Sequence, residues 1–106
     1  MSVKDLGSLF KQAQEMQSKM ADVQRDLAEK KVEVSTGGGM VKIVANGVNE
    51  IISVHIDEEL INMNDREVLE DLITGAINEV HRKVKELAQE EMTRFTGGIK
   101  IPGLFP

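Results

Sequence analysis

The chain has 106 residues, no cysteine, three aromatic residues and a formal net charge of −5. This length predicts a single domain spanning 1–106, and the lack of cysteine excludes a disulfide framework, a thiolate nucleophile and a cysteine-based metal site. No apolar stretch reaches the roughly 18 residues of a membrane span, and the start of the sequence lacks a signal-peptide core. We therefore expect a cytoplasmic protein, with an acidic balance that is unusual for one that binds a polyanion.

The first predicted element is a long amphipathic helix over residues 4–31. Its apolar residues recur at alternating spacings of three and four over about three heptads. They are Leu6, Leu9, Ala13, Met16, Met20, Val23 and Leu27. A stripe this narrow is typical of a helix that packs along one seam, so we expect Met16 and Met20 to fill a core.

Period-two patterning follows and predicts three strands within residues 32–57. The apolar residues that share faces are Val32 and Val34, then Val41, Ile43 and Ala45, then Val48, Ile52, Val54 and Ile56. Asn46-Gly47 predicts a two-residue type I′ turn between two of these strands, in which Gly47 has a positive φ. Gly37–Gly39 joins the first two strands as a turn, so the strands form an antiparallel meander.

A second long helix is predicted over residues 64–95. Asn64 with Glu67 three residues later forms a capping box at its start, and Gly97-Gly98 ends its broad apolar face. Residues 96–106 hold both prolines and are expected to be a tail. The fold class is therefore α+β, with the order α-β-β-β-α and a three-stranded antiparallel meander flanked by two long helices.

The two helices are expected to be longer than the sheet that they flank. Strands of about 6–9 residues make a sheet about 20–30 Å long, whereas the first helix extends roughly 40 Å. Apolar stripes would therefore overhang the sheet of a monomer, and exposed patches of that size mark partner surfaces. We expect self-association, most simply as a two-fold dimer.

The motifs that could carry chemistry have simpler structural interpretations. A phosphate-binding loop needs a helix and a Gly-Lys-Ser/Thr sequence after its glycines, whereas Gly37–Gly39 precedes a strand. His55 and His81 have no second ligand or nucleophile signalled beside them, so surface positions are expected. The acidic run at 57–59 lacks the ligand spacing of a calcium loop and is assigned to a turn and a helix start. We predict no enzymatic activity, metal or cofactor.

Basic side chains remain as candidate binding residues. The first helix carries six of them, and all but Lys30 lie off the apolar seam. They are Lys4, Lys11, Lys19, Arg25, Lys30 and Lys31, and a second cluster in the last helix holds Arg82, Lys83 and Lys85. Considered alone, such charges usually form only a solvated helix face.

The order and spacing of several short motifs resemble one known family. The motifs are Gly37-x-Gly39-Met40-Val41-Lys42-Ile43, Asn46-Gly47, Val54-x-Ile56-Asp57, Leu69-Glu70-Asp71-Leu72-Ile73 and Ala76-Ile77-Asn78, together with Leu6-Gly7-x-Leu9-Phe10-Lys11-Gln12-Ala13-Gln14 and the Gly/Pro tail. In these features the sequence resembles the YbaB/EbfC family of bacterial nucleoid-associated DNA-binding proteins, over nearly its whole length.

The resemblance implies a homodimer formed through the central sheets, with paired long helices projecting like tweezers. It also implies binding of duplex DNA with little sequence selectivity, no enzymatic activity, a place in the nucleoid, and an influence on chromosome organisation and gene expression. The family's helical DNA contacts correspond here to basic residues of both long helices. They are Arg82, Lys83, Lys85, Lys11, Lys19, Arg25 and Lys31.

A second hypothesis comes from a different functional class. The same dimer could be a helical clamp that grips a helix of a partner protein and has no direct role with DNA. Salt separates the two hypotheses. Phosphate contacts release counterions, so DNA affinity falls steeply as salt rises, whereas an apolar groove is almost indifferent to salt.

Overall fold

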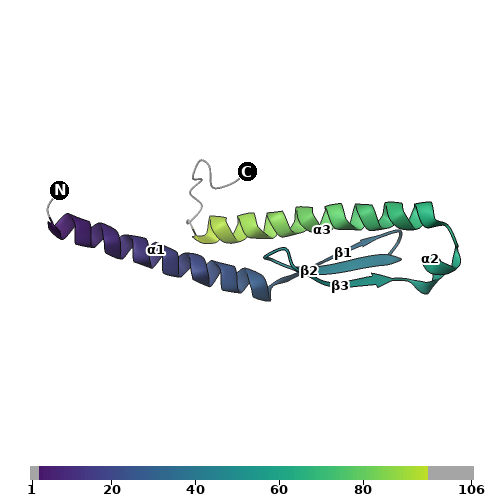
Figure 1. Ribbon diagram of the computed structural model, residues 1–106, viewed down its shortest axis with the longest axis horizontal. Coiled ribbons are helices and arrows are strands. Elements are labelled where there is room, and N and C mark those ends of the chain that lie inside the picture. The colour runs from purple at the N-terminus through teal and green to yellow at the C-terminus, as the bar shows by residue number, and fades with distance from the viewer. Residues whose placement is uncertain (1–2, 96–106) are drawn as a thin grey trace.

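The computed structural model describes residues 3–95 and confirms the predicted α+β fold (Figure 1). The elements in chain order are α1 (Val3–Glu29), β1 (Lys31–Thr36), β2 (Val41–Asn46), β3 (Ile51–Ile56), α2 (Glu58–Asn62) and α3 (Arg66–Phe95). The short helix α2 was not predicted as a separate element. The predicted tail at 96–106 lies outside the described residues.

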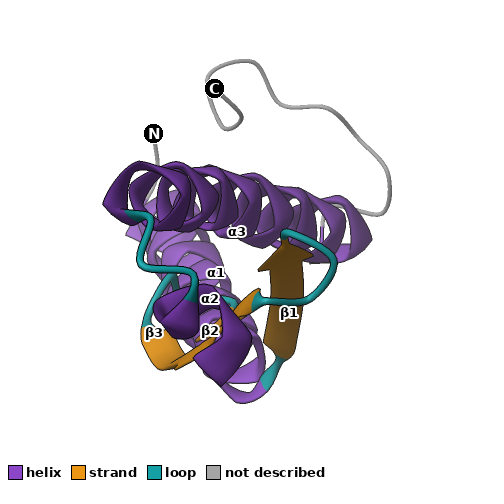
Figure 2. Ribbon diagram, turned by 90° about the vertical axis from the view of Figure 1, so that its right-hand side faces the viewer, coloured by secondary structure: helices purple, strands orange, loops and turns teal. Residues whose placement is uncertain are grey.

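The core lies between one face of the sheet and α3. The strands follow the order β1-β2-β3, and both pairs are antiparallel. Figure 2, viewed along the long axis of the molecule, shows α3 crossing over one face of this sheet. The buried apolar residues that pack together there are Val34, Val41, Ile43, Ala45, Leu60, Ala76, Val80 and Val84.

The molecule is strongly elongated because α1 projects away from this core (Figure 1). Its extents are 72 × 23 × 19 Å and its radius of gyration is 20.1 Å. A compact chain of this length would have a radius of gyration of about 13 Å. Most of α1 therefore gains no burial from its own subunit.

The predicted seam of α1 is uncovered within one chain. Leu27 is the one fully buried side chain among residues 5–29 of this helix. Leu6, Leu9 and Met16 are each about half exposed, at 54, 49 and 54%. The expectation that Met16 fills a core is therefore wrong for a single subunit, whereas Met20 is half-buried.

The glycine run forms the predicted turn between β1 and β2. Gly37, Gly38 and Gly39 all have positive φ, at 62, 66 and 94°. The amide of Gly39 donates to the carbonyl of Thr36 at 3.3 Å, which closes the turn. Three consecutive left-handed residues are strained for side chains with a Cβ, so glycine serves the backbone here and not a phosphate.

The predicted two-residue turn at Asn46-Gly47 is wrong. Asn46 ends β2, and its side-chain oxygen accepts hydrogen bonds from the amides of Val48 and Glu50, at 3.1 and 3.0 Å. The positive φ of 67° belongs to Asn49, and Gly47 lies outside the left-handed region. The Asn46 side chain mimics a backbone turn and so organises a wider, four-residue connection.

The predicted helix start at Asn64 is displaced by one residue. Asn64 has a φ of 52° in the left-handed region, and the Asp65 carboxylate accepts from the amide of Val68 at 3.3 Å. Asp65 is therefore the capping residue of α3. Asn and Asp are both good N-cap residues, so the sequence alone did not distinguish the two adjacent positions. The acidic run also starts a helix, since the Asp57 carboxylate accepts from the Glu59 amide and caps α2.

Candidate nucleic-acid interface

The basic cluster of α3 is partly neutralised by its own helix. Arg82 forms ion pairs with Glu79 and Glu86, one turn before it and one turn after it. The hydrogen bond from Arg82 lowers the pKa of the Glu79 carboxyl, which therefore stays ionised at neutral pH. Any phosphate that reaches Arg82 must compete with two carboxylates that are already in contact with it.

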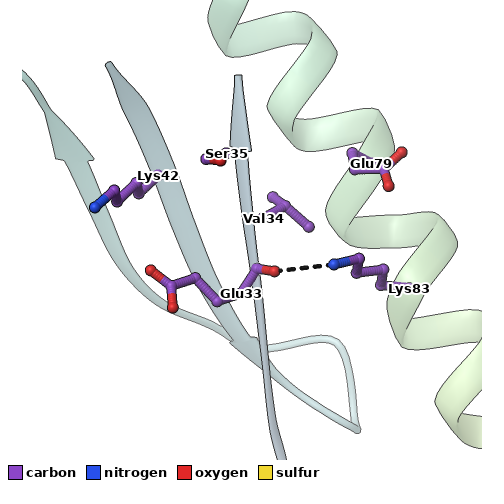
Figure 3. A pocket seen from close by; sticks show the side chains of 6 residues that line it. All are labelled: Glu33, Val34, Ser35, Lys42, Glu79 and Lys83. Atoms are coloured by element: carbon purple, nitrogen blue, oxygen red, sulfur yellow. Dashed lines mark hydrogen bonds between the residues drawn. The ribbon is translucent and has the colours of Figure 1, made fainter. Parts of the chain in front are cut away.

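Lys83 turns toward the edge strand β1. Its Nζ donates to the backbone carbonyl of Glu33 at 3.3 Å, as Figure 3 shows. A lysine against an unpaired edge strand is a common device that blocks further strand pairing. Lys83 is therefore engaged with the protein itself.

An open pocket of about 350 Å³ surrounds this contact between β1 and α3. Its lining residues are Glu33, Val34, Ser35, Lys42, Glu79 and Lys83 (Figure 3). The two lysines are balanced by two glutamates, so the pocket has no net charge to attract an anion.

Lys85 is the residue of this cluster whose charge remains available for contact with a ligand. Its side chain is exposed, and no ion pair engages it within the described part of the chain. The neighbouring Val84 is buried in the core. Lys85 and Arg82 therefore lie away from the core on the outer side of α3, three residues apart, as predicted.

The basic residues of the first helix are placed differently from one another. Lys11 and Lys19 are exposed on α1 and form no ion pair within residues 3–95, whereas Arg25 pairs with Asp22. Lys31 begins β1, so its predicted place on the helix is wrong. Figure 1 shows the first half of α1, which carries Lys11, extending beyond the end of α3.

The histidines are surface residues, as predicted. The Nδ1 atom of His81 lies 3.0 Å from the side-chain oxygen of Asn49, which joins α3 to the β2–β3 turn. His55 is exposed on β3 directly opposite Lys42. Within the described residues, no group of three or more acidic or histidine side chains is arranged to hold a metal ion. No described helix is long and apolar enough to cross a membrane.

One interaction had no signal in the local sequence. Glu91 of α3 is 6% exposed and pairs with both Lys30 and Arg94. Lys30 lies just after α1, 61 residues away, so no helical spacing could have predicted this contact. All four arginines are ion-paired, since Arg66 pairs with Glu70.

A sequence profile of the YbaB/EbfC DNA-binding family matches residues 1–99. The chain belongs to this family. It is similar to a nucleoid-associated protein of Caldanaerobacter subterraneus, with 45% identity over 95% of this chain and 91% of that protein. A nucleoid-associated protein of Desulfotalea psychrophila is 45% identical over 94% of each chain.

The fold also matches a solved structure. The crystal structure of an uncharacterized protein from Helicobacter pylori superposes with a TM-score of 0.74, covering 91% of this chain and 98% of that one. The two sequences are 23% identical, so this likeness supports the fold alone.

Proposed function

We propose that this protein is a nucleoid-associated homodimer that binds duplex DNA with little sequence selectivity, through basic side chains on its long helices. The observation that carries the proposal is the family match over residues 1–99, together with the names of relatives about 45% identical. Its place would be the nucleoid, with effects on chromosome organisation and gene expression.

The homodimer is supported by two uncovered apolar surfaces. The first is the α1 seam, and the second is β3, where Ile51, Ile52 and Val54 are 48, 47 and 52% exposed. β3 is an edge strand whose first five residues are all exposed, whereas most of β2 is buried. Burying both surfaces against a second copy would remove a strand edge and an apolar helix face from water at once.

The charge pattern supports lysines, more than arginines, as the DNA contacts. Each arginine already has a carboxylate partner, whereas Lys11, Lys19 and Lys85 are exposed without one in the described chain. A lysine acts on phosphate as a point charge and reads no base edge. Binding through such contacts is insensitive to sequence and sensitive to salt.

The test is a double charge reversal, Lys19→Glu with Lys85→Glu. We expect DNA affinity at low salt to fall more than about tenfold, because each subunit loses two attractions and gains two repulsions. The loss should be equal on two unrelated duplexes, measured by gel shift, with circular dichroism as the folding check. The matched control, Lys42→Glu with Arg66→Glu, changes net charge equally at positions outside the proposed contact set.

Three outcomes would count against the proposal. Unchanged binding by the folded double variant would remove these lysines from the interface. No binding by the parent protein even at low salt would reject the DNA function and favour the helical clamp for a protein partner. A folded monomer in sedimentation at micromolar concentration would reject the homodimer.

A further inference from the structure

Among residues 5–29 of α1, the buried and half-buried side chains are Met20, Val23 and Leu27, all in the C-terminal part of the helix. Leu27 is buried there at 5% exposure, and the amide of Gly47 donates to the carbonyls of Leu27 and Lys30, at 2.8 and 3.1 Å. These bonds add a partner to a carbonyl in the last turn of α1 and to the carbonyl of the residue that follows the helix, where backbone acceptors lack intrahelical donors. The β2–β3 turn therefore caps α1.

The close approach at this cap leaves no room for a side chain on Gly47. A Cβ added to Gly47 would lie 2.5 Å from the Leu27 carbonyl oxygen and 2.9 Å from a methyl carbon of the same residue. The first neighbour is backbone and cannot rotate away. The absence of a Cβ at Gly47 thus sets how near the end of α1 comes to the sheet.

An ionic contact ties the same region to α3. The Glu91 carboxylate accepts a hydrogen bond from Lys30 Nζ and forms an ion pair with Arg94 at 3.2 Å. Arg94 lies on the same helix as Glu91, whereas Lys30 lies between α1 and β1, so the Lys30 bond crosses between segments. The other ion pairs described above each lie within one helix.

A carboxylate at 6% exposure is costly unless it is paired. An apolar residue at position 91 could be buried at lower cost, but it would be compatible with many arrangements of the end of α1. A buried ion pair is compatible with few arrangements of the end of α1, because any displacement of Lys30 leaves Glu91 with a single partner. The hydrogen bond from Lys30 also lowers the pKa of Glu91 against the opposing effect of burial, so the Glu91 carboxylate is ionised at neutral pH.

We propose that Glu91 is a positioning residue that, together with Gly47, fixes the direction in which α1 leaves the body of the protein. We call the contacts of Gly47 and Glu91 with the end of α1 the joint. A small rotation at the joint moves the far end of α1 by a large distance, because the helix has 27 residues. At about 1.5 Å per residue, a tilt of about 10° at the joint displaces the far end of α1 by about 7 Å. The joint therefore decides where Lys11 and Lys19 lie relative to α3.

The test measures this direction without DNA. The chain has no cysteine, so Gln14→Cys and Asn78→Cys place one spin label on α1 and one on α3, both at exposed positions. Labelled protein is diluted with excess unlabelled protein, so that the distance measured by pulsed electron paramagnetic resonance lies within one subunit. If the joint fixes the direction of α1, the distance between the two labels should have a single narrow distribution in the parent.

Glu91→Gln should broaden that distribution by about 4 Å, because the label at position 14 lies roughly 22 Å along α1 from the joint. Glu90→Gln is the matched control, since it removes the same charge from the adjacent, exposed position. Lys30→Gln should reproduce the broadening and Lys30→Arg should not. Folding of each variant is checked by circular dichroism.

A folded Glu91→Gln variant with the parent's distribution would overturn the proposal. If Glu91→Gln does not fold, Lys30→Gln decides the matter by the same criterion, because it leaves Arg94 to pair with Glu91. A DNA-affinity measurement adds a second readout that rests on the proposed function. Failure of the parent to bind DNA would reject that function and leave the distance result standing.

Discussion

The amide of Gly47 lies 2.8 Å from the carbonyl oxygen of Leu27, so a turn between two strands closes the end of a helix that precedes them. This contact explains why position 47 needs glycine even though its φ is not positive. The requirement is for space and for a free N–H, and both are set by a residue 20 positions earlier in the chain.

We therefore expect Gly47→Ala to lower the free energy of unfolding by about 2 kcal/mol, because the added methyl group overlaps backbone. Gly7→Ala is the matched control. Nothing lies within 4 Å of a Cβ placed at Gly7, which is inside α1, so alanine there should stabilise the helix by about 0.5–1 kcal/mol. Urea unfolding of both variants measures the difference. Equal stability of Gly47→Ala and the parent would show that α1 is not held against this turn.

The cap of α3 gives a second prediction. Asp65→Ala should cost about 1 kcal/mol of unfolding free energy, because the amide of Val68 loses its acceptor. Asn64→Gly should be nearly neutral, since Asn64 has a φ of 52°, a conformation that glycine adopts without strain. Thermal melts compare the two variants. A larger loss at Asn64 than at Asp65 would place the cap at the position that the sequence pattern first indicated.

The Lys30–Glu91 pair predicts a pH dependence of stability. Because the folded-state pKa of Glu91 is lowered, its contribution is fully present above the ordinary glutamate pKa of about 4.3 and disappears as pH falls through the lowered value. The difference in unfolding free energy between the parent and Glu91→Gln should thus be largest at neutral pH and shrink in the acid range below about pH 4.3. Urea titrations across that range, with Glu90→Gln as the control, measure it. A difference that stays constant with pH would mean that the carboxylate charge contributes nothing.

Local periodicity was enough to predict the order of the main elements. The heptad of α1, the alternation in β2 and the apolar face of α3 are properties of nearby residues, and they depend little on the rest of the chain. Turn and cap positions were less well determined. Asn46 and Asn49, or Asn64 and Asp65, carry the same kind of signal within three residues of each other, and tertiary contacts select between them.

The candidate interface was predictable in part. Glu79 lies three residues before Arg82 and Glu86 lies four residues after it. These spacings are typical of ion pairs within a helix, so the neutralisation of Arg82 could be predicted from the sequence. The Lys83 contact with β1 and the Lys30–Glu91 pair have none, because each joins residues 50 or more positions apart. Those contacts exist only once the sheet and α3 have packed.

The neutralisation of Arg82 leads to a prediction about DNA binding. Glu79→Gln with Glu86→Gln would leave the guanidinium without a charged partner on a side of α3 that faces away from the core. Stability should change little, because exposed ion pairs contribute little to the free energy of unfolding. DNA affinity at low salt should rise, and the plot of log affinity against log salt should steepen by about 0.9 for each new phosphate contact.

The control separates a direct contact from a general loss of repulsion. Glu58→Gln with Glu59→Gln removes the same charge from exposed positions on α2, so it should raise affinity slightly without changing the salt slope. Adding Arg82→Gln to the Glu79 and Glu86 variant should then abolish the gain in slope. If the slope stays at the parent value in all three proteins, Arg82 does not contact phosphate even when its carboxylate partners are removed, and the DNA contacts of α3 fall to Lys85.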